Sequence, residues 1–200
     1  MSKRALAAAL LLHILVCSSV KAESVQDLQG LLSQGKFARV AERTDALLAS
    51  KPQDAQLRFL KGIALAELNR NADAIAVFQK LTEDYPDLPE PYNNLAVLHA
   101  KQKQYDKARL ALEAAIRLRP GYATAHENLG DVYAGLAGQA YDKAQSLDPS
   151  NAAARHKVSI IREITSISPA KAIAPSPLAT TPATLPTRPA PPITAPKDTQ

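Results

Sequence analysis

Cysteine is nearly absent from this 200-residue chain, which contains only Cys17. Cys17 lies at the end of an N-terminal apolar run, and we expect it to be removed when that run is cleaved. The remaining chain would have no thiol, which excludes a disulfide framework, a thiol nucleophile and a thiolate metal site. An oxidising compartment would tolerate such a composition.

Other signatures of chemistry are missing as well. Only seven glycines are present, mostly at recurring positions, and the sequence has no phosphate-cradling glycine loop, no His-Glu-x-x-His and no serine-centred elbow. His99 and His126 occupy positions where aromatic residues pack within a unit, so we expect core residues rather than ligands there. Basic residues do not gather with aromatics, which argues against nucleic acid. We therefore expect no catalytic residue, no cofactor and no metal.

The net charge of +5 comes from the two ends of the chain. Lys3, Arg4 and Lys21 belong to the N-terminal segment, and the C-terminal tail adds a further basic excess. Residues 23–167 carry 18 basic and 18 acidic side chains. The high isoelectric point therefore indicates no polyanionic partner.

Residues 1–22 are typical of a secretory signal peptide. A positive start precedes the apolar run 5–16, and Val20-Lys21-Ala22 places small residues where a signal peptidase reads. We expect cleavage after Ala22, release into the periplasm and no stable membrane span. A membrane anchor is the alternative, but a run of about 12 residues is too short to span a bilayer. Lipidation at Cys17 is a second alternative, although large residues precede it.

The strongest positive signal is a period of 34 residues, which groups three sets of residues. The sets are Pro52, Pro86 and Pro120; Leu28, Gly62, Ala96 and Gly130; and Leu31, Leu65, His99 and Tyr133. Between 55 and 120, apolar residues recur at three and four, and a proline ends each unit. Such a period predicts stacked helical hairpins that present an extended binding surface. The small residues should let paired helices approach closely; they are Gly62, Ala96 and Gly130 in first helices, and Ala74 and Ala108 in second helices.

These positions resemble the tetratricopeptide repeat (TPR) family over about residues 24–165. The unit 89–122 matches the family pattern at eight positions: Tyr92, Leu95, Ala96, Tyr105, Ala108, Leu112, Ala115 and Pro120. The resemblance implies an all-α solenoid of about four helix-turn-helix units within a domain 23–167, closed by a C-terminal capping helix over 151–167.

The fourth unit departs from the period because Pro149 comes five residues early. The missing residues fall near the hairpin turn, where Gly135 and Gly138 lie in the segment Ala134–Gln139. We expect a shortened unit with a tight turn there. Residues 168–200, of which nine are proline, predict a disordered tail. Such a tail is a plain linker, a docking segment or a spacer.

The resemblance also assigns a concave surface lined by first helices, and we call the following residues the predicted groove: Phe59, Ile63, Asn93, Asn94, Val97, Lys101, Glu127, Asn128 and Asp131. Asn94 and Asn128 are 34 apart, which predicts a ladder of amides suited to an extended peptide. Glu127 and Asp131 could instead form a carboxylate pair of a hydrolase, but nothing in the sequence buries or polarises them.

The functional expectation is an exported, non-enzymatic scaffold that binds a protein or peptide in this groove. Its resemblance to exported TPR proteins implies a part in cell-envelope assembly. The alternative is an accessory subunit that activates or localises a peptidoglycan-modifying enzyme.

Overall fold

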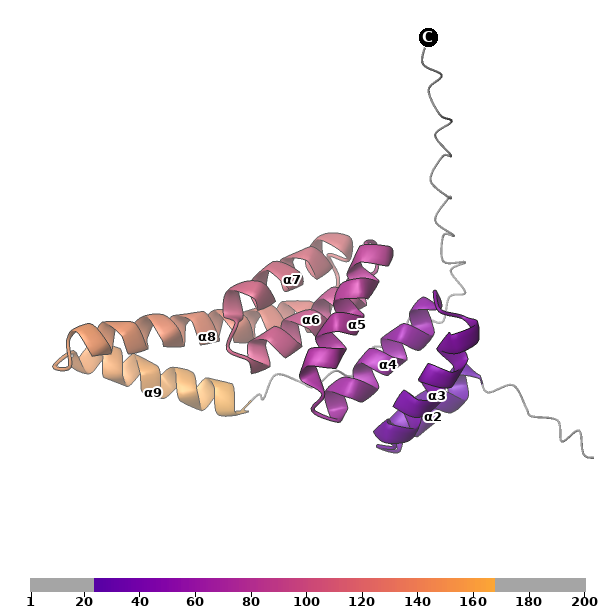
Figure 1. Ribbon diagram of the computed structural model, residues 1–200. Coiled ribbons are helices and arrows are strands. Elements are labelled where there is room, and N and C mark those ends of the chain that lie inside the picture. Colours follow the sequence, from indigo (N-terminus) through magenta and orange to yellow (C-terminus); the bar gives the residue numbers. More distant parts are fainter. Residues whose placement is uncertain (1–23, 168–200) are drawn as a thin grey trace, which may run out of the picture.

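The computed structural model describes residues 24–167, with side chains through residue 164, and its regular structure there is entirely helical. The helices, in chain order, are α2 (Val25–Ser33), α3 (Phe37–Ser50), α4 (Ala55–Glu67), α5 (Asn71–Asp84), α6 (Pro89–Lys101), α7 (Tyr105–Leu118), α8 (Ala123–Leu147) and α9 (Ala152–Ile167). The first six form hairpins that stack side by side (Figure 1). The predicted all-α solenoid is confirmed.

Each hairpin turns at a residue with left-handed backbone. Gly35, Asn69 and Lys103 have φ values of 70°, 59° and 58°, and they are 34 residues apart. Glycine adopts this conformation at no steric cost, whereas asparagine and lysine accept some strain. The turn geometry thus repeats with the sequence even though the residue type does not.

Small residues lie where the helices of a hairpin meet. An ideal Cβ on Gly62 would lie 2.7 Å from two ring carbons of Phe78, and Ala74, Ala96 and Ala108 are completely buried. This confirms the expected close approach in the second and third units. Gly130 breaks the pattern because it is exposed and nothing lies within 4 Å of its ideal Cβ.

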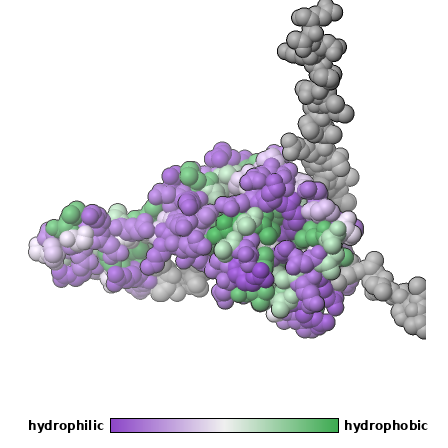
Figure 2. Space-filling model, viewed as in Figure 1, coloured by the Kyte–Doolittle hydropathy of each residue, from purple (hydrophilic) through white to green (hydrophobic). Residues whose placement is uncertain are grey.

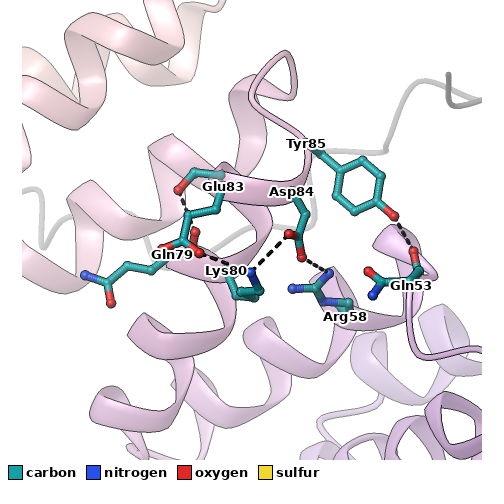
Figure 3. Close-up of polar contacts among 8 residues, drawn as sticks. Gln53, Arg58, Gln79, Lys80, Glu83, Asp84 and Tyr85 are labelled. Atoms are coloured by element: carbon teal, nitrogen blue, oxygen red, sulfur yellow. Dashed lines mark hydrogen bonds and ion pairs between the residues drawn. The ribbon is translucent and has the colours of Figure 1, made fainter. Parts of the chain in front are cut away.

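Polar contacts also hold the second hairpin together (Figure 3). Arg58 on α4 donates to Asp84 at the end of α5 over 2.8 Å, and Lys80 lies 3.1 Å from the other oxygen of that carboxylate. The hydroxyl of Tyr85 donates to the carbonyl oxygen of Gln53. These contacts join the entry of α4 to the exit of α5.

The tight turn expected in the fourth unit is absent. Residues 134–139 are helical, and α8 runs through them without interruption. Gly135 packs beneath the ring of Tyr105: an ideal Cβ on Gly135 would lie 2.5 Å from a ring carbon of Tyr105. Gly138 lies beside Ile161 of α9. Because these glycines admit neighbouring side chains, tertiary packing offsets their low helix propensity of about 1 kcal/mol each. The chain therefore continues straight where the earlier units reverse.

The second half of α8 and the antiparallel α9 form an arm that projects from the stacked hairpins (Figure 1). The expected capping helix thus exists, and it packs on α8 through Ala154 and Val158. Ile161 is half-buried, whereas Ile164, expected on the same apolar stripe, is 48% exposed.

Hydrophilic side chains cover most of the face seen in Figure 2, with apolar patches among them over the stacked hairpins. Within residues 24–167, no helix combines the length and the apolarity that crossing a bilayer requires. The expected signal peptide, 1–22, and tail, 168–200, lie outside the described residues.

Candidate functional site

The predicted groove residues come from three first helices, α4, α6 and the first half of α8. Most of them are buried rather than open to solvent. The apolar members Phe59, Ile63 and Val97 are 2–3% exposed, and the amides Asn93, Asn94 and Asn128 are 2–5% exposed. Asp131 is half-buried, whereas Lys101 and Glu127 are exposed. The apolar members therefore belong to the hydrophobic core, and the polar region of the site lies on α6 and α8.

The predicted amide ladder has a different pairing. Asn128 donates through Nδ2 to Oδ1 of Asn93 over 2.9 Å, whereas Asn94 donates to the carbonyl oxygen of Glu90 in its own helix. The buried bond between Asn93 and Asn128 joins α6 to α8 across two units. The 34-residue spacing predicted the correct pair of helices, α6 and α8. The residue of α6 that bonds Asn128 is Asn93, however, and not Asn94.

Glu90 is the most deeply buried acid at this site, with 2% of its surface exposed. Its Oε1 atom lies 2.6 Å from Nη2 of Arg119, and the Arg119 guanidinium also covers the ring of Tyr122 at 5.2 Å. Arg119 lies in the link between α7 and α8, so it belongs to no first helix. No periodic signal pointed to it, because the residues at the matching positions are Lys51 and Tyr85.

Four oxygen atoms around this region are buried without a hydrogen-bond partner. They are Oε2 of Glu90, Oδ1 of Asn94, Oδ1 of Asn128 and Oδ2 of Asp131, and we call these residues the acceptor cluster. Glu90 and Asn94 share one face of α6, and Asn128 and Asp131 share one face of α8, because residues three or four apart are neighbours on a helix. In the described part of the chain, every buried side-chain polar atom that lacks a partner is an oxygen.

The acceptor cluster has a negative electrostatic character. Burial raises the pKa of Asp131, and the nearby Glu127 carboxylate raises it further. Both effects disfavour the charged form of Asp131, and a cation placed in the cluster would relieve them. No group of three potential metal-ligating side chains occurs among the residues that the structure describes. The unpartnered oxygen atoms of the cluster can accept hydrogen bonds.

Stacked antiparallel hairpins with a polar face on their first helices define an α-solenoid of the protein-interaction type. Three stretches match repeat families: residues 29–89 and 77–110 match the family described as "Tetratricopeptide repeat", and residues 99–136 match "TPR repeat". The chain belongs to the tetratricopeptide repeat family. Proteins of this fold are generally non-catalytic scaffolds.

Individual proteins are similar over parts of their length. The chain is 36% identical over 90 residues to the "Tetratricopeptide repeat domain-containing protein PYG7, chloroplastic" of Arabidopsis thaliana, covering 42% of this chain and 30% of that protein. It is 28% identical over 127 residues to "Protein O-mannosyl-transferase TMTC1" of Mus musculus, covering 57% of this chain and 13% of the relative. The chain thus spans less than a third of either protein.

Solved structures show the same fold. Two crystal structures of MamA are 22% identical to the chain, with TM-scores of 0.51 and 0.52. The similarity covers 70% and 74% of this chain, and 79% and 88% of the respective MamA chains.

Proposed function

We propose that this protein is an exported, non-enzymatic scaffold that binds an extended segment of another protein on the face formed by α4, α6 and α8. The observation that carries the proposal is the acceptor cluster, in which four buried oxygen atoms have no hydrogen-bond partner. An unpaired buried polar group costs about 1–3 kcal/mol. A ligand that donates hydrogen bonds to these atoms would recover part of that free energy.

The chemistry of the ligand follows from the negative charge and the hydrogen-bond acceptors of the site. An extended peptide supplies a row of backbone N–H donors, and a lysine or arginine side chain supplies charged ones. Either would pair with Asn94 and Asn128, and a cation would also stabilise ionised Asp131. An acidic C-terminus would instead meet Asp131 and Glu127 and be repelled, whereas Glu90 is already paired with Arg119. The proposed ligand is therefore a neutral or basic extended segment.

We place this scaffold in the periplasm, where cell-envelope assembly takes place. The charged start, the apolar run and the small residues ending at Ala22 support export, as does a repeat domain without cysteine. The balanced charge of residues 23–167 also supports a protein partner over nucleic acid.

Site-specific photocrosslinking tests the binding face. A photoreactive amino acid would replace exposed Lys101, on the groove side of α6, or exposed Leu110, on α7, as the matched control. The probe is a panel of synthetic ten-residue peptides, basic, neutral and acidic, added to the purified protein. We expect crosslinks from position 101 to basic and neutral peptides, and few from position 110. Equal labelling at both positions, or a preference for acidic peptides, would refute this assignment.

A further inference from the structure

Helix α8 occupies the place of two helices in the repeat. Phe78, Leu112 and Tyr141 each lie eight residues before a repeat proline, so they hold the same position at the end of a unit. Sixteen residues separate Gly62 from Phe78, but only 11 separate Gly130 from Tyr141. The five residues are therefore missing from the stretch that matches 97–111 of the third unit, which contains its turn and the start of α7. Without them the fourth unit does not fold back on itself.

The first half of α8 consequently lacks the helix that covers its counterparts. Gly62 and Ala96 are buried beneath their own second helices, whereas Gly130 at the same position is exposed. Leu65 and His99 are 2% and 9% exposed, whereas Tyr133 at the same position is 51% exposed. This open face of α8, containing Gly130 and Tyr133, is a hairpin interface without its second helix.

The residue that should close this interface lies farther along the same helix. Phe78 covers Gly62 in the second unit, so Tyr141 is the residue expected to cover Gly130. Eleven residues correspond to about three helical turns, which puts both residues on one face but about 16 Å apart along the axis. Tyr141 therefore cannot reach Gly130 of its own chain.

We propose that the missing helix is supplied by a second copy of this chain, in a two-fold dimer formed by antiparallel pairing of α8. In this arrangement each Tyr141 lies over the partner's Gly130, and the partner's Tyr141 lies over Gly130 of the first chain. The two-fold axis passes between residues 135 and 136. That point is also the middle of α8, which runs from 123 to 147, so the two helices overlap along their whole length.

Such an exchange follows from the shortened connection. When a hinge is too short to reverse the chain, the element after it cannot pack on its own chain. It packs instead at the equivalent place on a second copy, and the two copies make this contact reciprocally. Helix α9 contacts α8 near Gly138, about 80° around the helix from Gly130, and at Tyr141, where Nζ of Lys157 lies 5.0 Å from the ring centre. It leaves Gly130 and Tyr133 exposed. In the dimer the Tyr141 ring would exchange its contact with the flexible Lys157 side chain for the partner's Gly130. The dimer thus completes two fourth units, and its contact is centred on a face of α8 about 160° from Asn128 and 100° from Asp131.

The mass of the purified full-length chain in solution, measured by light scattering after gel filtration, tests the proposal. We expect the mass of two chains at micromolar concentration. Gly130→Leu should keep its helical circular dichroism spectrum, because nothing lies within 4 Å of that position in one chain. It should raise the dimer dissociation constant at least tenfold, because the added side chain would meet the partner's Tyr141.

Gly30→Leu is the matched control, since Gly30 on α2 also has nothing within 4 Å. It should leave the dimer unchanged. A second test inserts the sequence of residues 105–109 after Gly138, which restores the turn and the full period. We expect this insertion to give a folded monomer. A single-chain mass for the unaltered protein at 100 µM would overturn the proposal, and so would equal dimerisation of the Gly130→Leu and Gly30→Leu variants.

Disulfide trapping tests the geometry directly. In a Cys17→Ser background, the double variant Gly130→Cys with Tyr141→Cys should form a covalent dimer on oxidation. The two positions are about 16 Å apart within one helix, too far for an intramolecular disulfide. Each single variant should remain uncrosslinked, because residue 130 of one chain and residue 130 of its partner are also about 16 Å apart in the antiparallel pair. The same holds for the two copies of residue 141. Covalent dimers from the single variants, or none from the double variant, would contradict the pairing.

Discussion

The ring of Phe78 packs so closely against Gly62 that a single methyl group on Gly62 would lie 2.7 Å from it. The ring has no room to move, because it is completely buried and packs edge-on against the ring of Phe59, with 5.7 Å between the two ring centres. This contact fixes how near α4 and α5 approach one another.

We therefore expect Gly62→Ala to destabilise the protein by about 1–3 kcal/mol, the usual cost of overpacking. Gly30→Ala adds the same methyl group to an open helical position, and there the gain in helix propensity of up to about 1 kcal/mol should dominate. Thermal unfolding followed by circular dichroism compares the two. Because neighbouring units stabilise one another, the loss in Gly62→Ala should affect the whole transition. Equal melting temperatures would contradict the helical pairing.

Asp84 contributes to the same hairpin through an ion pair. The hydrogen bond from Arg58 lowers the pKa of Asp84, with a smaller contribution from Lys80 and against an opposing effect of burial. A carboxyl group with a lowered pKa stabilises the fold above its unfolded pKa, and this stability is lost as the pH falls through the folded value.

Asp84→Asn should therefore lower the stability at pH 7 by about 1 kcal/mol, the upper range for a partly exposed pair. The difference from the unaltered protein should begin to shrink below about pH 3.8, the ordinary pKa of the group, and vanish only when the pH has passed the lowered folded pKa, where Asp84 is itself protonated. Urea titrations at pH 7 and at a series of pH values below 4 measure both effects. Lys80→Gln, which alters only the exposed partner, is the control and should change little.

His99 makes the third unit sensitive to acid. Burial lowers the pKa of His99, Lys107 lowers it further, and the hydrogen bond with Gln104 opposes both effects. Because the folded pKa lies below the unfolded one, the stability is fully present above about pH 6.5 and is lost as the pH falls toward the folded pKa.

His99→Leu should remove this component, and leucine fits because it occupies the matching positions 31 and 65. We expect the difference in melting temperature between variant and unaltered protein to grow by about 2–4 °C between pH 7.5 and pH 5, as about 1 kcal/mol would produce. A difference that stays constant with pH would show that His99 does not titrate against the fold.

The features that depend on local spacing were predictable from the sequence. The 34-residue period located the hairpins, and the small residues marked the contact of Gly62 with Phe78. The straight α8 was not predictable in this way, because Gly135 and Gly138 are equally consistent with a turn. What decides between them is packing against Tyr105 and Ile161, which are distant in the sequence.

The burial of the groove amides was missed for a similar reason. A helical pattern shows which face a residue shares with its neighbours, but not how closely the next helix lies over it. His126 was expected in the core and is exposed, bonded through Nε2 to the carbonyl oxygen of Pro120, because the helix that would cover it is absent.

The buried bond between Asn93 and Asn128 changes what substitutions at the site should do. Asn128→Ala leaves Oδ1 of Asn93 without its donor, which should cost about 1–3 kcal/mol. A double-mutant cycle with Asn93→Ala should give a coupling free energy of about 1 kcal/mol, because the two residues share one contact. Chemical denaturation of the four proteins measures it. Strict additivity would mean that the bond does not form in solution.

Asp131 should affect stability and binding in opposite directions. Burial and then Glu127 raise its pKa, and a carboxyl group with a raised pKa stabilises the fold below its unfolded pKa and loses that stability as the pH rises through the folded value. At pH 7 the ionised group is therefore a cost. Asp131→Asn removes the charge and keeps the shape, so we expect its melting temperature at pH 7 to rise by about 2–4 °C.

The same substitution should weaken the binding of a basic peptide by about tenfold, because the buried charge that attracts the cation is gone. A neutral peptide should be affected much less. Glu127→Gln is the control: its side chain is exposed, so it should weaken both effects without abolishing either. Calorimetric titration with a basic peptide and a neutral peptide of equal length, combined with thermal melts of the three proteins, measures binding and stability together. If Asp131→Asn bound the basic peptide unchanged, the acceptor cluster would not be the contact for its cations. If the variant were also less stable, Asp131 would be a structural residue that hydrogen-bonds its surroundings, and the buried oxygen would have a partner in solution.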